Sequence, residues 1–315
     1  MMATRRDIIR QGAGASGAAL IGSLAGCSGV MGGTDTSITA ASMQWTEAKL
    51  MGYLGFESLK ANTEFDVTNE LSLGGSMQCF QALKSGDIDF YHLYTAGAYA
   101  TIPPKHDQTL KDPEQLYQRA KTELREEHDL AYLQRATFNN TYALAVRPDW
   151  QAQTGVETIS EFAAYLDSGN TDLSVVLGPE FAERADGWPG LTEAYGFADA
   201  AEDLTIRKIG ANLTYQVLGE GEADVGMVFT TNPKIEKYDL AVLEDDRQFF
   251  APYNPAPLAR VDVVEERPAV ADALEAPMAA LDSEETVIDL NSRISLEGAD
   301  VQTVATEFLE SEGII

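Results

Sequence analysis

The feature that most constrains the fold is an internal repeat of sixteen residues. Residues 80–95 read FQALKSGDIDFYHLYT, and residues 215–230, displaced by 135 positions, read YQVLGEGEADVGMVFT. Each copy contains helix-forming residues, then a glycine suited to the left-handed end of a helix, and then a short apolar strand. The repeat predicts two similar α/β halves, although a helix, a glycine and a strand in this order also occur in many unrelated α/β proteins.

Apolar runs elsewhere in the chain also follow the pattern of an α/β protein. Strands are predicted at residues 38–42, 65–71, 88–91, 142–146, 173–177 and 225–229. Helical segments are predicted at residues 112–132, 272–281 and 301–309. Gly74 and Gly75 predict a turn, with Ser76 as the N-cap of a helix that extends to Lys84.

The charge of the chain excludes some partners. Asp and Glu number 50 against 22 Lys and Arg, which gives a formal net charge of -28. Such a chain is not expected to bind nucleic acid or an anionic membrane surface. Because the acidic residues are spread along the chain, they predict a hydrated acidic surface, with a specific cationic partner as the alternative. At about 1 M salt the screening length is about 3 Å, so this surface favours an origin in an extreme halophile.

The N-terminal segment has the order of features that is typical of an export signal. Arg5 and Arg6 form a twin-arginine pair, and the apolar run over residues 13–25 is too short to span a membrane. This run ends at the sequence LAGC, which resembles a lipobox whose cysteine is Cys27. We expect residues 1–26 to be a twin-arginine lipoprotein signal peptide and Cys27 to carry a lipid. Residues 27–37 would then form a flexible tether that holds the folded body at the outer surface of the cell membrane.

No motif in the chain requires catalytic chemistry. Once Cys27 is lipidated only Cys79 is left, which predicts a core thiol and no internal disulfide. His92, His106 and His128 have no metal-ligand spacing. The chain also has no phosphate-binding loop, nucleophile elbow or dinucleotide fingerprint. The sequence therefore predicts no metal, no cofactor and no enzymatic activity.

Four longer motifs carry a family resemblance. They are LGGSMQCFQALKSGDIDFYHLYT from Leu73, FNNTYALAVR from Phe138, PEFAERADGWPGL from Pro179, and YDLAVLEDDRQFFAPYNPAP from Tyr238. With these motifs, residues 38–315 resemble the OpuAC-like substrate-binding proteins of osmoprotectant ABC transporters, which bind glycine betaine, choline or carnitine.

The resemblance implies a two-lobed, periplasmic-binding-protein-like (type II) α/β fold with two crossing hinge segments. Lobe 1 would comprise residues 38–138 plus 248–315, and lobe 2 residues 139–247. The hinges would lie near Asn140 and Phe250. One copy of the repeat then falls in each lobe.

The same resemblance implies the ligand contacts. They are an aromatic cage of Tyr94, Tyr142, Phe229 and Tyr253, an arginine for the ligand carboxylate at Arg184, and a further contact at Asn140. A quaternary ammonium group has no N–H to donate, so aromatic faces suit it, and the planar fork of an arginine suits a carboxylate.

Several positions depart from the family pattern and leave the choice of ligand open. The family often has Lys at Met43, Glu at Leu93, Gly and Thr at Ala96 and Gly97, Tyr at Phe229, and Asp at Asn232. Phe229 keeps its ring and loses only a hydroxyl, so the cage is expected to survive. Met43 and Gly97 are expected to remove support for the ligand carboxylate.

Three classes of function are compatible with this sequence. An importer binding protein, which hands a small osmolyte to its permease, explains the tether, the lobes and the cage. A ligand-sensing lipoprotein would carry the same features and differ only in its membrane partner. An enzyme on the same fold would need a nucleophile or an acid–base pair in the cleft.

The export signal can be tested directly. Replacing Arg5 and Arg6 by Lys should block export, and Cys27→Ser should release a soluble form because no lipid can then be attached. Cell fractionation with immunoblotting measures both effects. Recovery of unprocessed protein from the cytoplasm of wild-type cells would contradict the prediction.

Overall fold

The computed structural model describes residues 37–315. The predicted signal peptide, the lipidation site at Cys27 and residues 27–36 of the predicted tether lie outside these residues. Ser37 is the first residue of strand β1 and pairs with Asp66. No helix within residues 37–315 is both long and apolar enough to cross a membrane.

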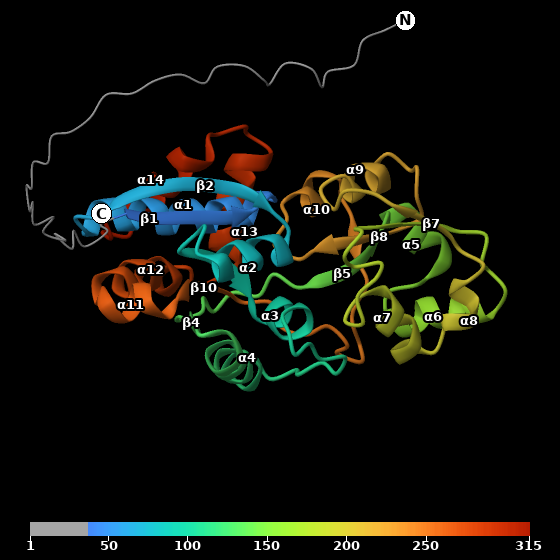
Figure 1. Cartoon of the computed structure of the whole chain (residues 1–315). Coiled ribbons are helices and arrows are strands. Elements are labelled where there is room, and N and C mark those ends of the chain that lie inside the picture. The colour runs from blue at the N-terminus through green and yellow to red at the C-terminus, as the bar shows by residue number, and fades with distance from the viewer. Residues whose placement is uncertain (1–36) are drawn as a thin grey trace, which may run out of the picture. The chain divides into compact units, whose positions relative to one another are not determined.

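Two five-stranded sheets form the centres of two lobes (Figure 1). The first sheet has the order β2-β1-β3-β10-β4, and the second has the order β7-β6-β8-β5-β9. In the first sheet β1 is parallel to β2 and β3, and β10 is antiparallel to β3 and β4. In the second sheet β6 is parallel to β7 and β8, whereas β5 is antiparallel to β8 and β9. The two sheets confirm the predicted two-lobed α/β fold.

The strand bounds of the first sheet are β1 (Ser37–Met43), β2 (Asp66–Gly74), β3 (Phe90–Tyr94), β4 (Leu130–Tyr132) and β10 (Pro255–Arg260). Those of the second are β5 (Tyr142–Val146), β6 (Ser174–Leu177), β7 (Thr205–Lys208), β8 (Val225–Phe229) and β9 (Ala241–Val242).

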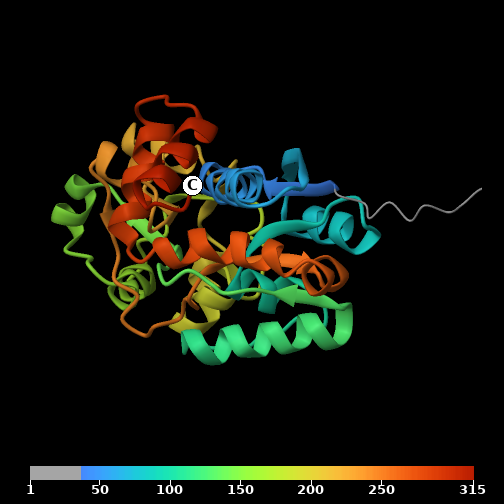
Figure 2. The ribbon, with the colours of Figure 1, turned by 90° about the vertical axis from the view of Figure 1, so that its left-hand side faces the viewer.

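Helices cover both faces of the first sheet. One face packs against α1 (Thr46–Asn62), α11 (Val261–Glu266) and α12 (Pro268–Ala280), and α13 (Glu284–Ser295) and α14 (Val301–Ser311) pack on the outer side of α1. The other packs against α2 (Ser76–Ser85), α3 (Thr95–Thr101) and α4 (Pro113–His128). Figure 2 shows α1 (blue) in the upper part of the view and α4 (green) at the bottom. The predicted core residue Cys79 is fully buried among α2 and its neighbours, which confirms that prediction.

Helices also lie on both faces of the second sheet. α5 (Pro148–Thr154), α6 (Ile159–Asp167), α7 (Trp188–Tyr195) and α8 (Ala198–Ala201) share one apolar cluster with the sheet. α9 (Thr214–Gly219) and α10 (Lys234–Lys237) pack against the opposite face.

The structure confirms the internal repeat and explains its aspartates. Gly86 and Gly221 both adopt left-handed backbone angles, with φ of 81° and 76°. Asp89 exchanges two hydrogen bonds with the backbone of Thr39, and its Oδ2 accepts from the Thr39 N–H at 2.7 Å. At the matching position of the second copy, Asp224 exchanges two hydrogen bonds with the backbone of Ser174. Its Oδ2 accepts from the Ser174 N–H at 2.8 Å. In each lobe the repeated aspartate therefore fixes the start of the neighbouring parallel strand.

The two crossing segments run side by side, antiparallel, between the sheets. Residues 133–141 lead from β4 to β5, and residues 243–254 lead from β9 to β10. The backbone N–H of Asn140 donates to the Tyr253 carbonyl at 3.0 Å. The amide of Asn254 donates to the carbonyl oxygens of Phe138 and Thr137 at 2.7 and 3.2 Å.

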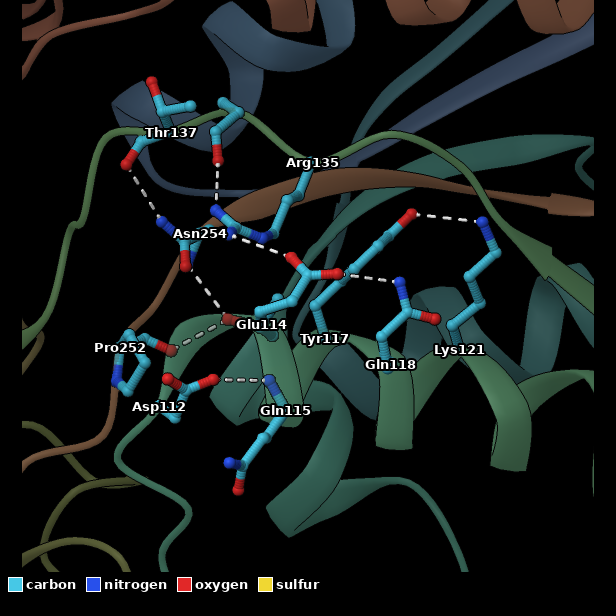
Figure 3. A network of polar contacts seen from close by, with 12 residues as sticks. Asp112, Glu114, Gln115, Tyr117, Gln118, Lys121, Arg135, Thr137, Pro252 and Asn254 are labelled. Atoms are coloured by element: carbon cyan, nitrogen blue, oxygen red, sulfur yellow. Dashed lines mark hydrogen bonds and ion pairs between the residues drawn. The ribbon is translucent and has the colours of Figure 1, made fainter.

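Both crossing segments and the start of α4 take part in the polar network that Figure 3 shows, and the first segment contacts α4. The Arg135 guanidinium donates a hydrogen bond to the carbonyl oxygen of Ala136, and it lies 3.4 Å from the Glu114 carboxylate of α4. Asp112 caps the same helix by accepting from the Gln115 N–H at 2.7 Å. These contacts fasten the first crossing segment and α4 to one lobe.

Two local predictions are wrong in detail, and one interior strand was missed. The predicted helical segment at residues 112–132 ends at His128, because Asp129 takes a left-handed φ of 56°, and residues 130–132 form β4. Ser76 does not cap α2; Gly75 occupies the cap position, and the Ser76 hydroxyl contacts the Met43 sulfur at 3.4 Å. Strand β10 was not predicted, since its two prolines normally exclude a run from the interior of a sheet.

Candidate functional site

A cavity of about 580 Å³ lies between the two lobes. It is lined by residues at or just beyond the carboxyl ends of the parallel strands β1, β2, β3, β6, β7 and β8. Each sheet therefore presents its carboxyl edge, the usual place for a ligand in an open α/β sheet, to the same space. Its volume is in the range of small-molecule sites.

All six side chains predicted to contact the ligand line this one cavity: Tyr94, Asn140, Tyr142, Arg184, Phe229 and Tyr253. Tyr94 ends β3, and Tyr142 and Phe229 are direct cross-strand partners in β5 and β8. Asn140 and Tyr253 come from the two crossing segments. The sequence prediction thus selected residues that the fold brings together, while their contact with a ligand stays a prediction.

Three of the predicted cage rings touch one another, and the fourth stands apart. The Tyr142 ring centroid lies 4.9 Å from that of Phe229 and 5.2 Å from that of Tyr253. Tyr94 instead pairs with Trp45, at 6.3 Å between centroids. Aromatic faces thus come to the cavity from both lobes.

The tyrosine hydroxyls of this site are held protonated. Tyr94, Tyr142 and Tyr253 are 5–6% exposed. Burial raises the pKa of Tyr142 to about 12, and it raises the pKa values of Tyr94 and Tyr253 well above their ordinary value. These hydroxyls therefore act as neutral donors at physiological pH.

Arg184 already has protein partners. Its Nε and Nη2 donate to the two carboxylate oxygens of Asp186, at 2.8 and 2.5 Å, and Nη2 also donates to the Tyr253 hydroxyl at 2.7 Å. Its Nη1 lies 3.8 Å from the Glu180 carboxylate. Burial opposes the charge of this guanidinium, but Tyr253, Tyr142 and Asp186 outweigh that cost, so the pKa of Arg184 lies well above its ordinary value.

The occupied fork of Arg184 changes the expected geometry of binding. An arginine offers five N–H donors, and Asp186 and Tyr253 take those on one side. A ligand carboxylate is left with the Nη1 side of the guanidinium, where Glu180 is a competitor. The prediction from sequence did not include this pairing with Asp186.

Among the lining side chains that sequence reasoning missed are Trp45, Lys49 and Phe181. Trp45 follows β1 at the same sheet edge as Tyr94, and Phe181 lies in the PEFAERADGWPGL motif three positions before Arg184. These two positions in the sequence were the signals that could have identified Trp45 and Phe181 as lining residues. None of the ion pairs within residues 37–315 involves Lys49, so its charge is free to meet a ligand.

Four of the six positions that depart from the family pattern line this cavity, and one of them is Phe229 of the cage. Met43, Leu93 and Gly97 all line the cavity. Where the family often carries charged or polar groups, this part of the wall is therefore apolar.

Two α/β lobes joined by paired crossing segments, with an aromatic cavity between them, define a two-lobed substrate-binding protein of the type II class. The chain belongs to the OpuAC family, the substrate binding domain of ABC-type glycine betaine transport systems, whose model matches residues 36–311.

Known relatives and a solved structure agree with this assignment. The chain is 31% identical over 287 residues to the chemotactic signal transduction system substrate-binding protein CosB of Halobacterium salinarum, covering 89% of this chain and 85% of that protein. It is 33% identical over 257 residues to a glycine-betaine-binding protein of Pseudomonas aeruginosa, covering 80% of each. A crystal structure of a glycine betaine/carnitine/choline ABC transporter protein superposes with a TM-score of 0.70 at 23% identity, covering 88% of this chain and 99% of the other.

The Arg184–Asp186 pair generates a stability prediction. Arg184→Met leaves the Asp186 carboxylate buried without its counter-ion and should lower the free energy of unfolding by about 3 to 5 kcal/mol. The double variant Arg184→Met, Asp186→Leu should recover much of that loss. Urea unfolding of both single variants and the double variant measures the coupling. Additive effects in this cycle would show that the pair contributes nothing to the fold.

Proposed function

We propose that this chain is an extracytoplasmic lipoprotein that captures a quaternary ammonium zwitterion, with glycine betaine as the leading candidate, for the permease of an ABC importer. The observation that carries the proposal is the cavity, in which aromatic rings from both lobes and one arginine face the same space. Rings suit the trimethylammonium end of such a ligand, and the arginine suits its carboxylate.

The energies of these contacts are consistent with useful affinity. Each desolvated ring contributes about 0.5 to 2 kcal/mol to the binding of a cation, so four rings contribute about 2 to 8 kcal/mol. Micromolar binding requires about 8 kcal/mol. The cage alone is therefore marginal, and the carboxylate end must add to it.

Two cations are available for the carboxylate end of the ligand. Arg184 lines the cavity with its Nη1 not engaged by Asp186, and Lys49 lines the same cavity with no ion pair within residues 37–315. Lys49 thus offers a positive charge where Met43 replaces the lysine that is common in the family. This arrangement favours a zwitterion over choline, which has no carboxylate.

The export signal and the charge of the chain support the rest of the proposal. The twin-arginine pair, the apolar run and the lipobox at Cys27 support a lipid-anchored protein on the outer face of the cell membrane. The formal net charge of -28 supports a halophilic source.

A sensory role is the second candidate, and one specific observation favours it. The relative from Halobacterium salinarum is described as part of a chemotactic signal transduction system, and it shares 31% identity with this chain. A sensor would bind the ligand in the same cavity and pass its liganded form to a membrane transducer.

The importer and sensor roles can be separated in cells. If this chain serves an importer, deleting its gene should abolish uptake of radiolabelled betaine and leave chemotaxis unchanged, because only the permease loses its ligand supply. Loss of attraction to betaine with normal uptake would identify the sensor. Restoring the gene on a plasmid is the control.

The cage generates a binding prediction. Glycine betaine and 3,3-dimethylbutanoate, its tert-butyl isostere, have nearly the same shape, but only betaine carries a cation. A cation–π cage should prefer betaine, and the preference should persist at molar salt because the rings and cation are desolvated. Tyr94→Leu should remove about 1 to 2 kcal/mol of this preference, whereas Phe229→Tyr should keep it.

Calorimetry with both ligands at high salt measures this preference. A merely hydrophobic pocket would bind the two ligands alike or favour the isostere, which is easier to desolvate. Equal affinities for the wild-type protein would therefore reject the cage.

A further inference from the structure

Behind the cavity lies a buried carboxylate with an unusual set of partners. Glu47, in the first turn of α1, is 4% exposed. Its Oε1 accepts from the Tyr94 hydroxyl at 2.6 Å and from the Asn140 amide at 2.8 Å. Its Oε2 accepts from the Thr231 hydroxyl at 2.5 Å and from the Asn291 amide at 2.9 Å. These four donors fill the acceptor capacity of a carboxylate.

The charge of Glu47 has no counter-ion. None of the ion pairs within residues 37–315 involves Glu47, and all four of its hydrogen-bond donors are neutral groups. By contrast, the buried carboxylate of Asp186 is paired with Arg184 at 2.5 Å. Buried charges in proteins are normally paired, because burying a lone charge is costly. The chain therefore keeps one uncompensated negative charge next to its ligand cavity.

Glu47 is linked to the cavity through two of its donors. Tyr94 and Asn140 both line the cavity, and both donate to the same oxygen of Glu47. Burial, and next the nearby Glu47 charge, raise the pKa of Tyr94, so the phenol keeps its proton and donates it. A phenol that donates to an anion gains electron density, and this strengthens the negative face of its ring.

We infer that Glu47 is a specificity-determining positioning residue that supplies the buried counter-charge for the cationic group of the ligand. The inference rests on the proposed function, because it assumes that a cation binds at the cage. Glu47 acts in two ways. Its charge attracts the cation through a desolvated region, and its hydrogen bond fixes and polarises the Tyr94 ring.

The same contacts also allow a purely structural role, which must be separated from the proposed one. Thr231 follows β8 in the second lobe, whereas Asn291 lies on α13 in the first, so Glu47 links the two lobes. If Glu47 were only a latch between lobes, its loss would weaken closure around every ligand alike. A counter-charge attracts only a cationic group and repels the anionic isostere, so its loss should weaken betaine binding alone.

Glu47→Gln removes the charge and keeps the shape of the network. Asn291 has a buried Oδ1 without a partner within the described residues, so its amide can rotate to accept from the new Gln amide. The Thr231 hydroxyl can likewise rotate and accept. Tyr94 and Asn140 can still donate to the remaining carbonyl oxygen.

The expected result is a selective loss of affinity. Calorimetry should show glycine betaine binding to Glu47→Gln weakened about 10- to 30-fold, the effect of a unit charge acting over about 8 to 12 Å at an effective dielectric constant of about 20. Binding of 3,3-dimethylbutanoate should stay unchanged or become tighter, because Glu47→Gln removes only a repulsion from this anion. Thr231→Val, which removes a link between the lobes but no charge, is the matched control and should alter the affinities for both ligands by the same factor.

Each other outcome has a defined meaning. If Glu47→Gln weakens the binding of both ligands equally, or changes the binding of neither, the inference that Glu47 is a counter-charge is overturned. If the wild-type protein does not prefer betaine, the cage of the proposed function fails instead. Circular dichroism checks folding. Should Glu47→Gln not fold, Tyr94→Phe provides the test, because it keeps the ring and breaks its bond to Glu47. It should reduce the preference for betaine, and an unchanged preference would overturn the inference.

Discussion

The pairing of the two crossing segments is the interaction on which the rest of the structure depends. Asn140 and Tyr253 are joined backbone to backbone at 3.0 Å, and the Tyr253 N–H donates to the Asn139 side chain at 2.7 Å. The same two residues line the ligand cavity. A change in the angle between the lobes must therefore pass through the residues that form the site. This is how a two-lobed binding protein can couple closure to ligand contact.

Around these segments the polar groups of the cavity are arranged in two contrasting ways. On one side Arg184 is neutralised by Asp186 and held by the Tyr253 hydroxyl, so its orientation is fixed before any ligand enters. On the other, the buried Glu47 carboxylate accepts only from neutral donors and has no cationic partner within residues 37–315. Fixed groups cost little reorganisation when a ligand binds, which favours affinity and selectivity together.

The repeat shows how one local device built both lobes. Asp89 and Asp224 each fix the start of a neighbouring strand through the same pair of hydrogen bonds. The strands that follow end at Tyr94 and Phe229, which reach the cavity from the two lobes. The sequence pattern predicted this symmetry because each copy is one continuous stretch of helix, glycine and strand whose residue pattern can be compared directly. It could not predict that Tyr142 would lie directly opposite Phe229, since that requires the register of β5 against β8.

Local pattern determined by itself the α/β class, the two halves and most of the strands that carry the site, and the family resemblance implied six residues that the fold brings to one cavity. Only the tertiary structure decided what surrounds them. Strand β10 forms in the interior of a sheet despite Pro255 and Pro257, because its neighbours bond to the groups that it does offer. The pairing of Arg184 with Asp186, and the meeting of Glu47 with Thr231 and Asn291, follow from tertiary packing. Hydrogen-bond partners 184 and 244 positions apart leave no periodic trace in a sequence, because the fold alone brings them within reach.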